Sequence, residues 1–101
     1  MIVISDTTAI TNLFQVGQLS LLAKVFGRVM IPPAVETELS EVPGQWDFIA
    51  GMNFVEVKTP GDLAAVAHFK LSLDDGEAEA IALAIELQAD FLVMDEWKGA
   101  G

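Results

Sequence analysis

The sequence predicts an α/β domain with a mainly parallel central sheet, and three observations lead to this class. Short apolar segments typical of strands alternate with segments whose apolar residues recur at helical spacing. Apolar residues make up 52% of the 101 residues, as expected when strands are buried on both faces. Two strand-like segments end directly at an aspartate, and ligands of open parallel sheets bind at that end of the strands. We expect one small domain with one core.

The first half of the chain contains six segments with signals of regular structure. Two helical patterns end at glycines, Gly17 and Gly27, which are common just past helix ends. A proline pair, Pro32 and Pro33, opens a third helix, where a missing N–H costs nothing. The expected order is a strand at 1–5, helices at 7–16 and 19–26, a strand at 29–31, a helix from 32 to about 42 and a further helical turn at 46–50.

The second half alternates in the same way. The helix at 77–88 has the strongest pattern, and either Asp74 or Asp75 is a natural N-cap for it. We expect its buried face to carry Ala78, Ile81, Ala82, Ile85 and Ala89. The other expected elements are a strand at 54–57, a turn at 59–62, a short helix at 63–69 and a last strand at 91–94.

Charge and composition exclude several classes of protein. The net charge is −10, with 15 acidic residues against 5 lysines and arginines, whereas nucleic-acid-binding domains usually present a basic face. An acidic chain can still act on nucleic acid if its carboxylates hold divalent cations. There is no cysteine, hence no disulfide framework and no thiolate metal site. No apolar run approaches the roughly 18 residues of a membrane span, and no signal peptide is evident, so we expect a cytoplasmic protein.

Carboxylates at strand ends are the first candidates for a functional site. Asp6 follows the first strand and precedes a helix, so it is either a helix cap, a metal ligand or both. Asp95 follows the last strand in the same way. Glu96 could take the place of Asp95, because a one-residue shift at a strand end reverses which side chain faces the site.

Two glutamates on the predicted helices are further candidates. Glu38 and Glu79 each lie at the border of an apolar stripe, from which a carboxylate could reach a cleft. Spacing alone favours a solvated position for Glu38 and leaves both readings open for Glu79. The remaining acids of these segments are typical of helix faces and caps: Glu36, Glu41, Asp74, Asp75 and Glu77.

A site made of these carboxylates would suit a hard divalent cation. Mg²⁺ and Mn²⁺ prefer oxygen ligands, and in proteins Mg²⁺ uses a few carboxylates together with water and substrate phosphates. Such ions activate water and offset charge on a phosphodiester. Carboxylates that converge without a cation would repel one another. His68 is the single histidine, and the serines and threonines have no histidine base in a plausible arrangement, which argues against a serine-type nucleophile.

Four motifs in order along the chain resemble the PIN-domain nucleases, in particular the small prokaryotic branch related to the VapC toxins. They are "VISDTTAITNL", "IPPAVETEL", "LDDGEAEAIALAIEL" and "ADFLVMDEWKG". The resemblance implies a three-layer α/β fold around a mainly parallel sheet and a metal-dependent ribonuclease. It places the four catalytic and metal-binding acids of the family on Asp6, Glu38, Glu79 and Asp95. Possible accessory residues are Thr7, Thr8 and Glu96.

The resemblance also implies partners. We expect Mg²⁺ or Mn²⁺ as cofactor, RNA as substrate, a cognate antitoxin that covers the acidic cleft, and a homodimer. One departure is that the family pattern continues past the last motif through another strand and helix, so we expect a domain truncated at its C-terminus, with an exposed sheet edge. The alternatives are a catalytically impaired PIN-like domain that serves as a protein-binding or self-association module, and a carboxylate-based phosphatase.

Overall fold

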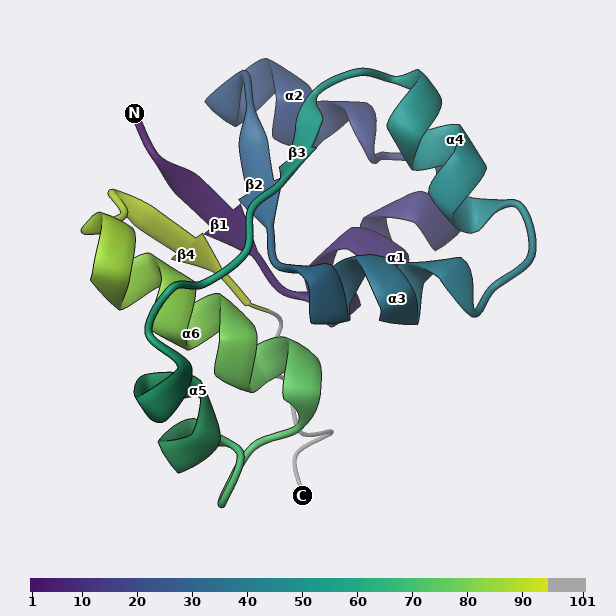
Figure 1. The fold of residues 1–101 in the computed structure, drawn as a ribbon. Coiled ribbons are helices and arrows are strands. Elements are labelled where there is room, and N and C mark those ends of the chain that lie inside the picture. The colour runs from purple at the N-terminus through teal and green to yellow at the C-terminus, as the bar shows by residue number, and fades with distance from the viewer. Residues whose placement is uncertain (95–101) are drawn as a thin grey trace, which may run out of the picture.

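A computed structural model describes residues 1–94 of the chain and shows a four-stranded sheet with helices on both faces (Figure 1). No helix within these residues is long and apolar enough to span a membrane. Strands and helices alternate in the order β1 (Val3–Ser5), α1 (Thr7–Gln15), α2 (Ser20–Phe26), β2 (Val29–Ile31), α3 (Pro33–Ser40), α4 (Gln45–Gly51), β3 (Val55–Val57), α5 (Leu63–Phe69), α6 (Asp75–Leu87) and β4 (Phe91–Val93).

The described strands are all parallel and lie in the order β3-β2-β1-β4. The chain therefore adds strands to one side of β1 until β3, and then crosses back to place β4 on the other side. In register, Ile4 lies opposite Met30 of β2 and opposite Leu92 of β4. The expected α/β class with a parallel sheet is confirmed.

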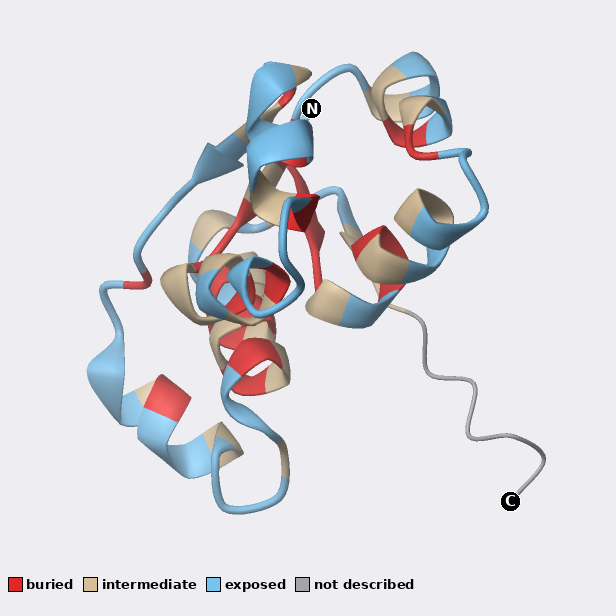
Figure 2. Ribbon diagram, turned by 90° about the vertical axis from the view of Figure 1, so that its right-hand side faces the viewer, coloured by how far each residue is buried: buried red, intermediate tan, exposed pale blue. Residues whose placement is uncertain are grey.

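Two hydrophobic clusters, one on each face of the sheet, make the fold three-layered. Alternation along β1 sends Val3 into one cluster and Ile4 into the other, because successive side chains of a strand point to opposite faces. The larger cluster joins the sheet to α1, α2, α3 and α4, and the smaller one joins it to α6 through Ala80 and Leu83. The helix α5 packs against α6 (Figure 1). Buried residues accordingly concentrate in the two central strands, β1 and β2, and on the helix sides that face the sheet, whereas the edge strands β3 and β4 contain none (Figure 2).

One predicted helix face was wrong in part. Ile85 of α6 was expected in the buried stripe but is 63% exposed, whereas Ala80 and Leu83 are fully buried. The helix packs on the sheet through Ala80 and Leu83 and buries Ala78 and Ala82 on its other side. At Ile85, this second side of the helix is exposed to solvent. A single apolar stripe could not reveal this, since α6 has neighbours on two sides.

Candidate active site

The candidate site lies where the sheet changes its winding direction. The connections from β1 to β2 and from β2 to β3 run through helices on one face, and the connection from β3 to β4 runs through α5 and α6 on the other face. The switch point is therefore the gap between the carboxyl ends of β1 and β4, the usual ligand-binding position in such sheets. Asp6 lies at this point, and its backbone N–H donates to the Val93 carbonyl at 3.0 Å.

Asp6 is the N-cap of α1. Its backbone is extended, and its Oδ1 accepts a hydrogen bond from the Ala9 N–H at 2.9 Å. This satisfies one of the amide groups that have no partner within the first turn of a helix. The side chain is held in a buried position, with only 3% of the residue exposed. The capping role expected for Asp6 is confirmed, and a role as metal ligand remains compatible with it.

Glu38 is brought to the start of α1 by the packing of α3 on α1 and α6. The Thr7 hydroxyl donates a hydrogen bond to Glu38 Oε1, which links residues 31 positions apart in the sequence. Gly76, in the first turn of α6, lies on the other side of this carboxylate. Thr7 therefore contacts Glu38, the second of the predicted acids, whereas Thr8 is exposed on the same helix.

Burial raises the pKa of the Glu38 carboxyl above its ordinary value. The Thr7 hydrogen bond opposes this rise in pKa, and the negative charges of Asp74, Glu41 and Asp75 add to it. Removal from water disfavours the charged form of an acid, and nearby carboxylates do the same. The carboxylates around Glu38 thus disfavour its charged form, which a bound cation would relieve. Lys70 offsets the charge of one of them, Asp75, in an ion pair of 3.8 Å.

Glu79 is held against the start of α3. Its Oε1 accepts a hydrogen bond from the Ala34 N–H at 3.1 Å, and Ala34 lies in the first turn of α3. The amides of a first helical turn have no partner within their own helix, so a carboxylate is well placed there. This bond connects α6 to α3 and fixes one oxygen of Glu79 close to the helix that carries Glu38.

Glu38 and Glu79 line the same acidic pocket. Its volume is about 410 Å³, and Asp75 and Glu41 also contribute carboxylates to it. Pro33, Ala34 and Thr37 of α3 complete the lining. Two of the four predicted acids therefore meet in one pocket on α3 and α6.

The other two predicted acids stand differently. Asp6 is next in sequence to Thr7, which binds Glu38, but Asp6 is not among the residues that line the pocket. Asp95 and its substitute Glu96 lie outside the described residues. Within residues 1–94 no three acidic, histidine or cysteine side chains are grouped closely enough to hold one metal ion.

The donor chemistry of the pocket nonetheless fits a hard divalent cation. Its possible ligands are carboxylate oxygens, and Mg²⁺ in proteins is often held by one or two carboxylates with several waters. Gly76 leaves room for one of these carboxylates, because a Cβ at position 76 would collide with Glu38.

Two features of the site were missed by the sequence interpretation. These are the glycine at position 76 and the backbone N–H of Ala34, neither of which was a candidate site residue. A glycine inside the first turn of an otherwise alanine-rich helix is a usable signal, because it costs up to about 1 kcal/mol relative to alanine and indicates a close approach. The contact of Glu79 with the Ala34 backbone has no signal in the side-chain pattern.

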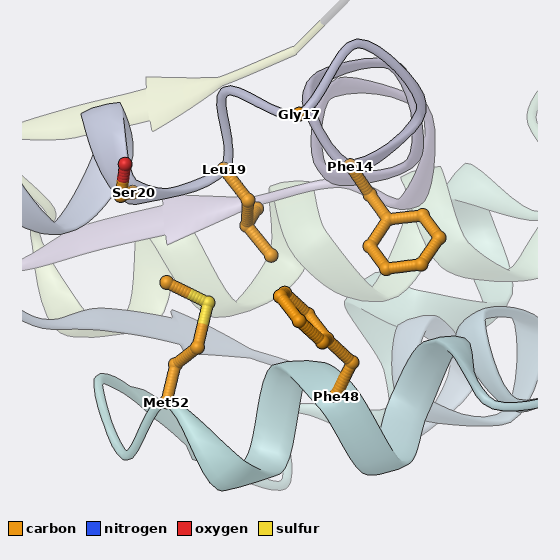
Figure 3. A pocket seen from close by; sticks show the side chains of 6 residues that line it. All are labelled: Phe14, Gly17, Leu19, Ser20, Phe48 and Met52. Atoms are coloured by element: carbon orange, nitrogen blue, oxygen red, sulfur yellow. The ribbon is translucent and has the colours of Figure 1, made fainter.

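A second pocket is apolar and lies between α4 and the α1–α2 corner (Figure 3). Its volume is about 350 Å³, and Phe14, Leu19, Phe48 and Met52 point toward one another across it. The rings of Phe14 and Phe48 meet edge to face at 5.4 Å. Phe48 is 57% exposed, so this pocket presents apolar surface to the solvent.

A parallel sheet with an acidic pocket formed by the helices at its switch point is the arrangement that the resemblance to PIN domains implies. The family model described as PIN domain matches residues 2–100, and the chain belongs to this family. PIN domains are generally nucleases that use divalent metal ions and act on nucleic acid. Neither a curated protein nor a solved structure matches the chain significantly.

Proposed function

We propose that the chain is an endoribonuclease that hydrolyses RNA phosphodiester bonds with the help of Mg²⁺ or Mn²⁺. The observation that carries this proposal is the convergence of Glu38 and Glu79 on one acidic pocket beside the sheet switch point. Membership of a nuclease family supports the reaction class. The oxygen-only donor set supports a hard divalent cation rather than a soft metal.

The proposal gives the residues distinct roles. We assign Asp6, Glu38, Glu79 and Asp95 as the acids that hold the ion. When bound, such an ion activates water and offsets the negative charge of the phosphodiester. The Thr7 hydroxyl donates to one carboxylate oxygen of Glu38, and the Ala34 N–H donates to one carboxylate oxygen of Glu79. Each hydrogen bond thereby orients the second oxygen of its glutamate. Water is the nucleophile, and a carboxylate of the site accepts its proton.

Cleavage of labelled RNA and of DNA of the same sequence tests this proposal. With Mn²⁺, the protein should cleave RNA and spare DNA, and EDTA should abolish the reaction. Glu38→Gln and Glu79→Gln should each lose activity. The matched controls Glu36→Gln, on α3, and Glu77→Gln, on α6, should retain it.

Three results would contradict the proposal or a part of it. Cleavage that persists in EDTA would exclude a metal-dependent mechanism. Equal losses in the site variants and in the control variants would show that charge on these helices, rather than the pocket, governs activity. Cleavage of DNA in preference to RNA would leave a nuclease but remove the ribonuclease assignment.

The toxin assignment is the finer part of the proposal and draws on the resemblance to VapC-like sequences. We propose a homodimeric toxin whose cognate antitoxin covers the acidic pocket. Expression in a bacterial host should arrest growth, and Glu38→Gln should relieve the arrest without lowering the amount of folded protein. Light scattering should give a mass of about twice 10.8 kDa for the purified protein. Normal growth with wild-type protein, or a monomer at every concentration, would contradict this part.

A second candidate function is a PIN-like domain that binds a protein partner or its own copy without catalysis. One observation favours it: the apolar pocket around Phe14 and Phe48 is exposed. Mn²⁺ distinguishes the two functions. A nuclease should gain thermal stability from Mn²⁺, whereas a binding module should show neither this gain nor cleavage of RNA.

A further inference from the structure

We infer that Gly76 is a positioning residue, whose missing side chain lets the Glu38 carboxylate sit between α1 and α6 in hydrogen-bonding contact with Thr7. The geometric part of this inference stands on its own, and its consequence for metal binding rests on the proposed function. Gly76 is buried in the first turn of α6, one residue after Asp75 of the acidic pocket.

The space that a side chain at position 76 would need is already filled. A Cβ at this position would lie 3.1 Å from Glu38 Cδ and 3.2 Å from Thr7 Oγ1, and it would overlap Glu38 Oε1 outright. The atoms of the Thr7–Glu38 hydrogen bond are thus the atoms that approach the α6 backbone. No other residue type leaves this space open.

A glycine here is costly by local criteria. Alanine is the best helix former, and glycine in a helix is destabilising because it loses more backbone freedom on folding. The next residues of the helix include four alanines, Ala78, Ala80, Ala82 and Ala84, so small side chains are readily accommodated in α6 elsewhere. Gly76 therefore occupies a position where helix propensity favours alanine and the contact with Glu38 excludes it.

Adding a methyl group at position 76 should move Glu38 rather than the helix. The atom that the new Cβ overlaps is the end of a flexible side chain, and the acidic pocket beside it is open for the carboxylate to enter. The backbone of α6 is fixed by the capping bond from Glu77 N–H to Asp74 Oδ1 at 2.8 Å and by the buried Ala80 and Leu83. The expected result is a folded protein in which Glu38 has left Thr7.

A double-mutant cycle between Gly76→Ala and Glu38→Ala tests the geometric part. With Glu38 removed, the Thr7 hydroxyl loses its acceptor and can turn away from the new Cβ. Gly76→Ala should then raise the melting temperature by roughly 3–5 °C, the gain that helix propensity predicts for a domain of this size. With Glu38 present, this gain should be absent or reversed. The same shift in both backgrounds would overturn the inference, since residues that do not contact each other have additive effects.

Gly51→Ala is the matched control for this cycle. Gly51 ends α4, and nothing lies within 4 Å of a Cβ built on it. Its substitution should therefore shift the melting temperature equally with and without Glu38. Unequal shifts for Gly51→Ala would mean that Glu38→Ala disturbs the whole fold, and the coupling at position 76 would then lose its support.

Mn²⁺ provides the second readout. In thermal unfolding with and without MnCl₂, Gly76→Ala should lose most of the stabilisation that Mn²⁺ gives the wild type, with an unchanged circular dichroism spectrum, while Gly51→Ala keeps it. A full Mn²⁺ response in Gly76→Ala would overturn the inference. If the wild type shows no Mn²⁺ response, the proposed metal-dependent function fails, and the cycle alone decides whether Gly76 positions Glu38.

Discussion

Replacing Thr7 by valine isolates the hydrogen bond that joins α1 to α3. Valine keeps the shape of threonine and removes the hydroxyl that donates to Glu38 Oε1. A hydrogen bond to a charged group contributes about 1.5–3 kcal/mol when buried. Glu38 is only half-buried, so solvent weakens this bond and a loss of about 1 kcal/mol is expected. For a domain of this size the melting temperature should fall by about 4–8 °C.

The loss in Thr7→Val should depend on pH. Burial raises the pKa of Glu38 and the Thr7 bond lowers it, so the variant should have a Glu38 pKa higher still. When the pH falls below this pKa, the carboxyl is neutral, and a neutral hydrogen bond contributes only about 0.5–1.5 kcal/mol. The difference in stability between wild type and Thr7→Val should therefore be largest at neutral pH and shrink in acid.

Urea unfolding at a series of pH values measures this difference. Thr8→Val is the matched control, because Thr8 follows Thr7 in the same helical turn and is exposed. Thr8→Val should change stability only slightly and equally at all pH values. Equal effects of the two substitutions, or an effect of Thr7→Val that grows in acid, would refute the reasoning about the Thr7–Glu38 contact.

Three further predictions follow from the same contacts. Glu38→Gln should raise the melting temperature of metal-free protein at neutral pH, and this gain should vanish in acid, because a raised pKa means that ionisation of Glu38 destabilises the fold; a loss at neutral pH would contradict this. Asp6→Asn should unfold within a few degrees of wild type but lose RNA cleavage, because asparagine also caps helices; retained cleavage would remove Asp6 from the site. Glu86→Ala should speed amide exchange at Gly61 and Asp62, whose N–H groups both donate to Glu86 Oε1 at 2.8 and 2.9 Å, whereas Glu86→Gln should not; unchanged exchange in Glu86→Ala would contradict it.

The order of elements was predictable from the sequence because local signals agree with the fold. Each strand was located to within two residues, and the strand at Val29–Ile31 and the helix at Leu63–Phe69 have the predicted bounds. Helix caps and breakers explain this success. The side chains of Asp62 and Asp74 each accept a hydrogen bond from the backbone N–H three residues later, as N-caps do. The parallel sheet followed from the alternation of strands and helices.

The site was less predictable because its contacts join distant parts of the chain. The sequence placed Glu38 and Glu79 at the borders of apolar stripes, but it could not show that Thr7 and Gly76 enclose one of them or that an Ala34 amide holds the other. Such contacts depend on how α3 packs on α1 and α6, and pairing across 31 or 45 residues has no local signal. The resemblance therefore identified the candidate acids, whereas the contacts of Glu38 and Glu79 could be known only from the packing of the helices.

Diffraction from crystals soaked in MnCl₂, recorded at a wavelength where manganese scatters anomalously, would locate a bound ion. We expect an anomalous peak in the acidic pocket, within coordination distance of carboxylate oxygens from both Glu38 and Glu79. A peak bound to other residues, or a fully ordered pocket with no peak at millimolar Mn²⁺, would contradict it.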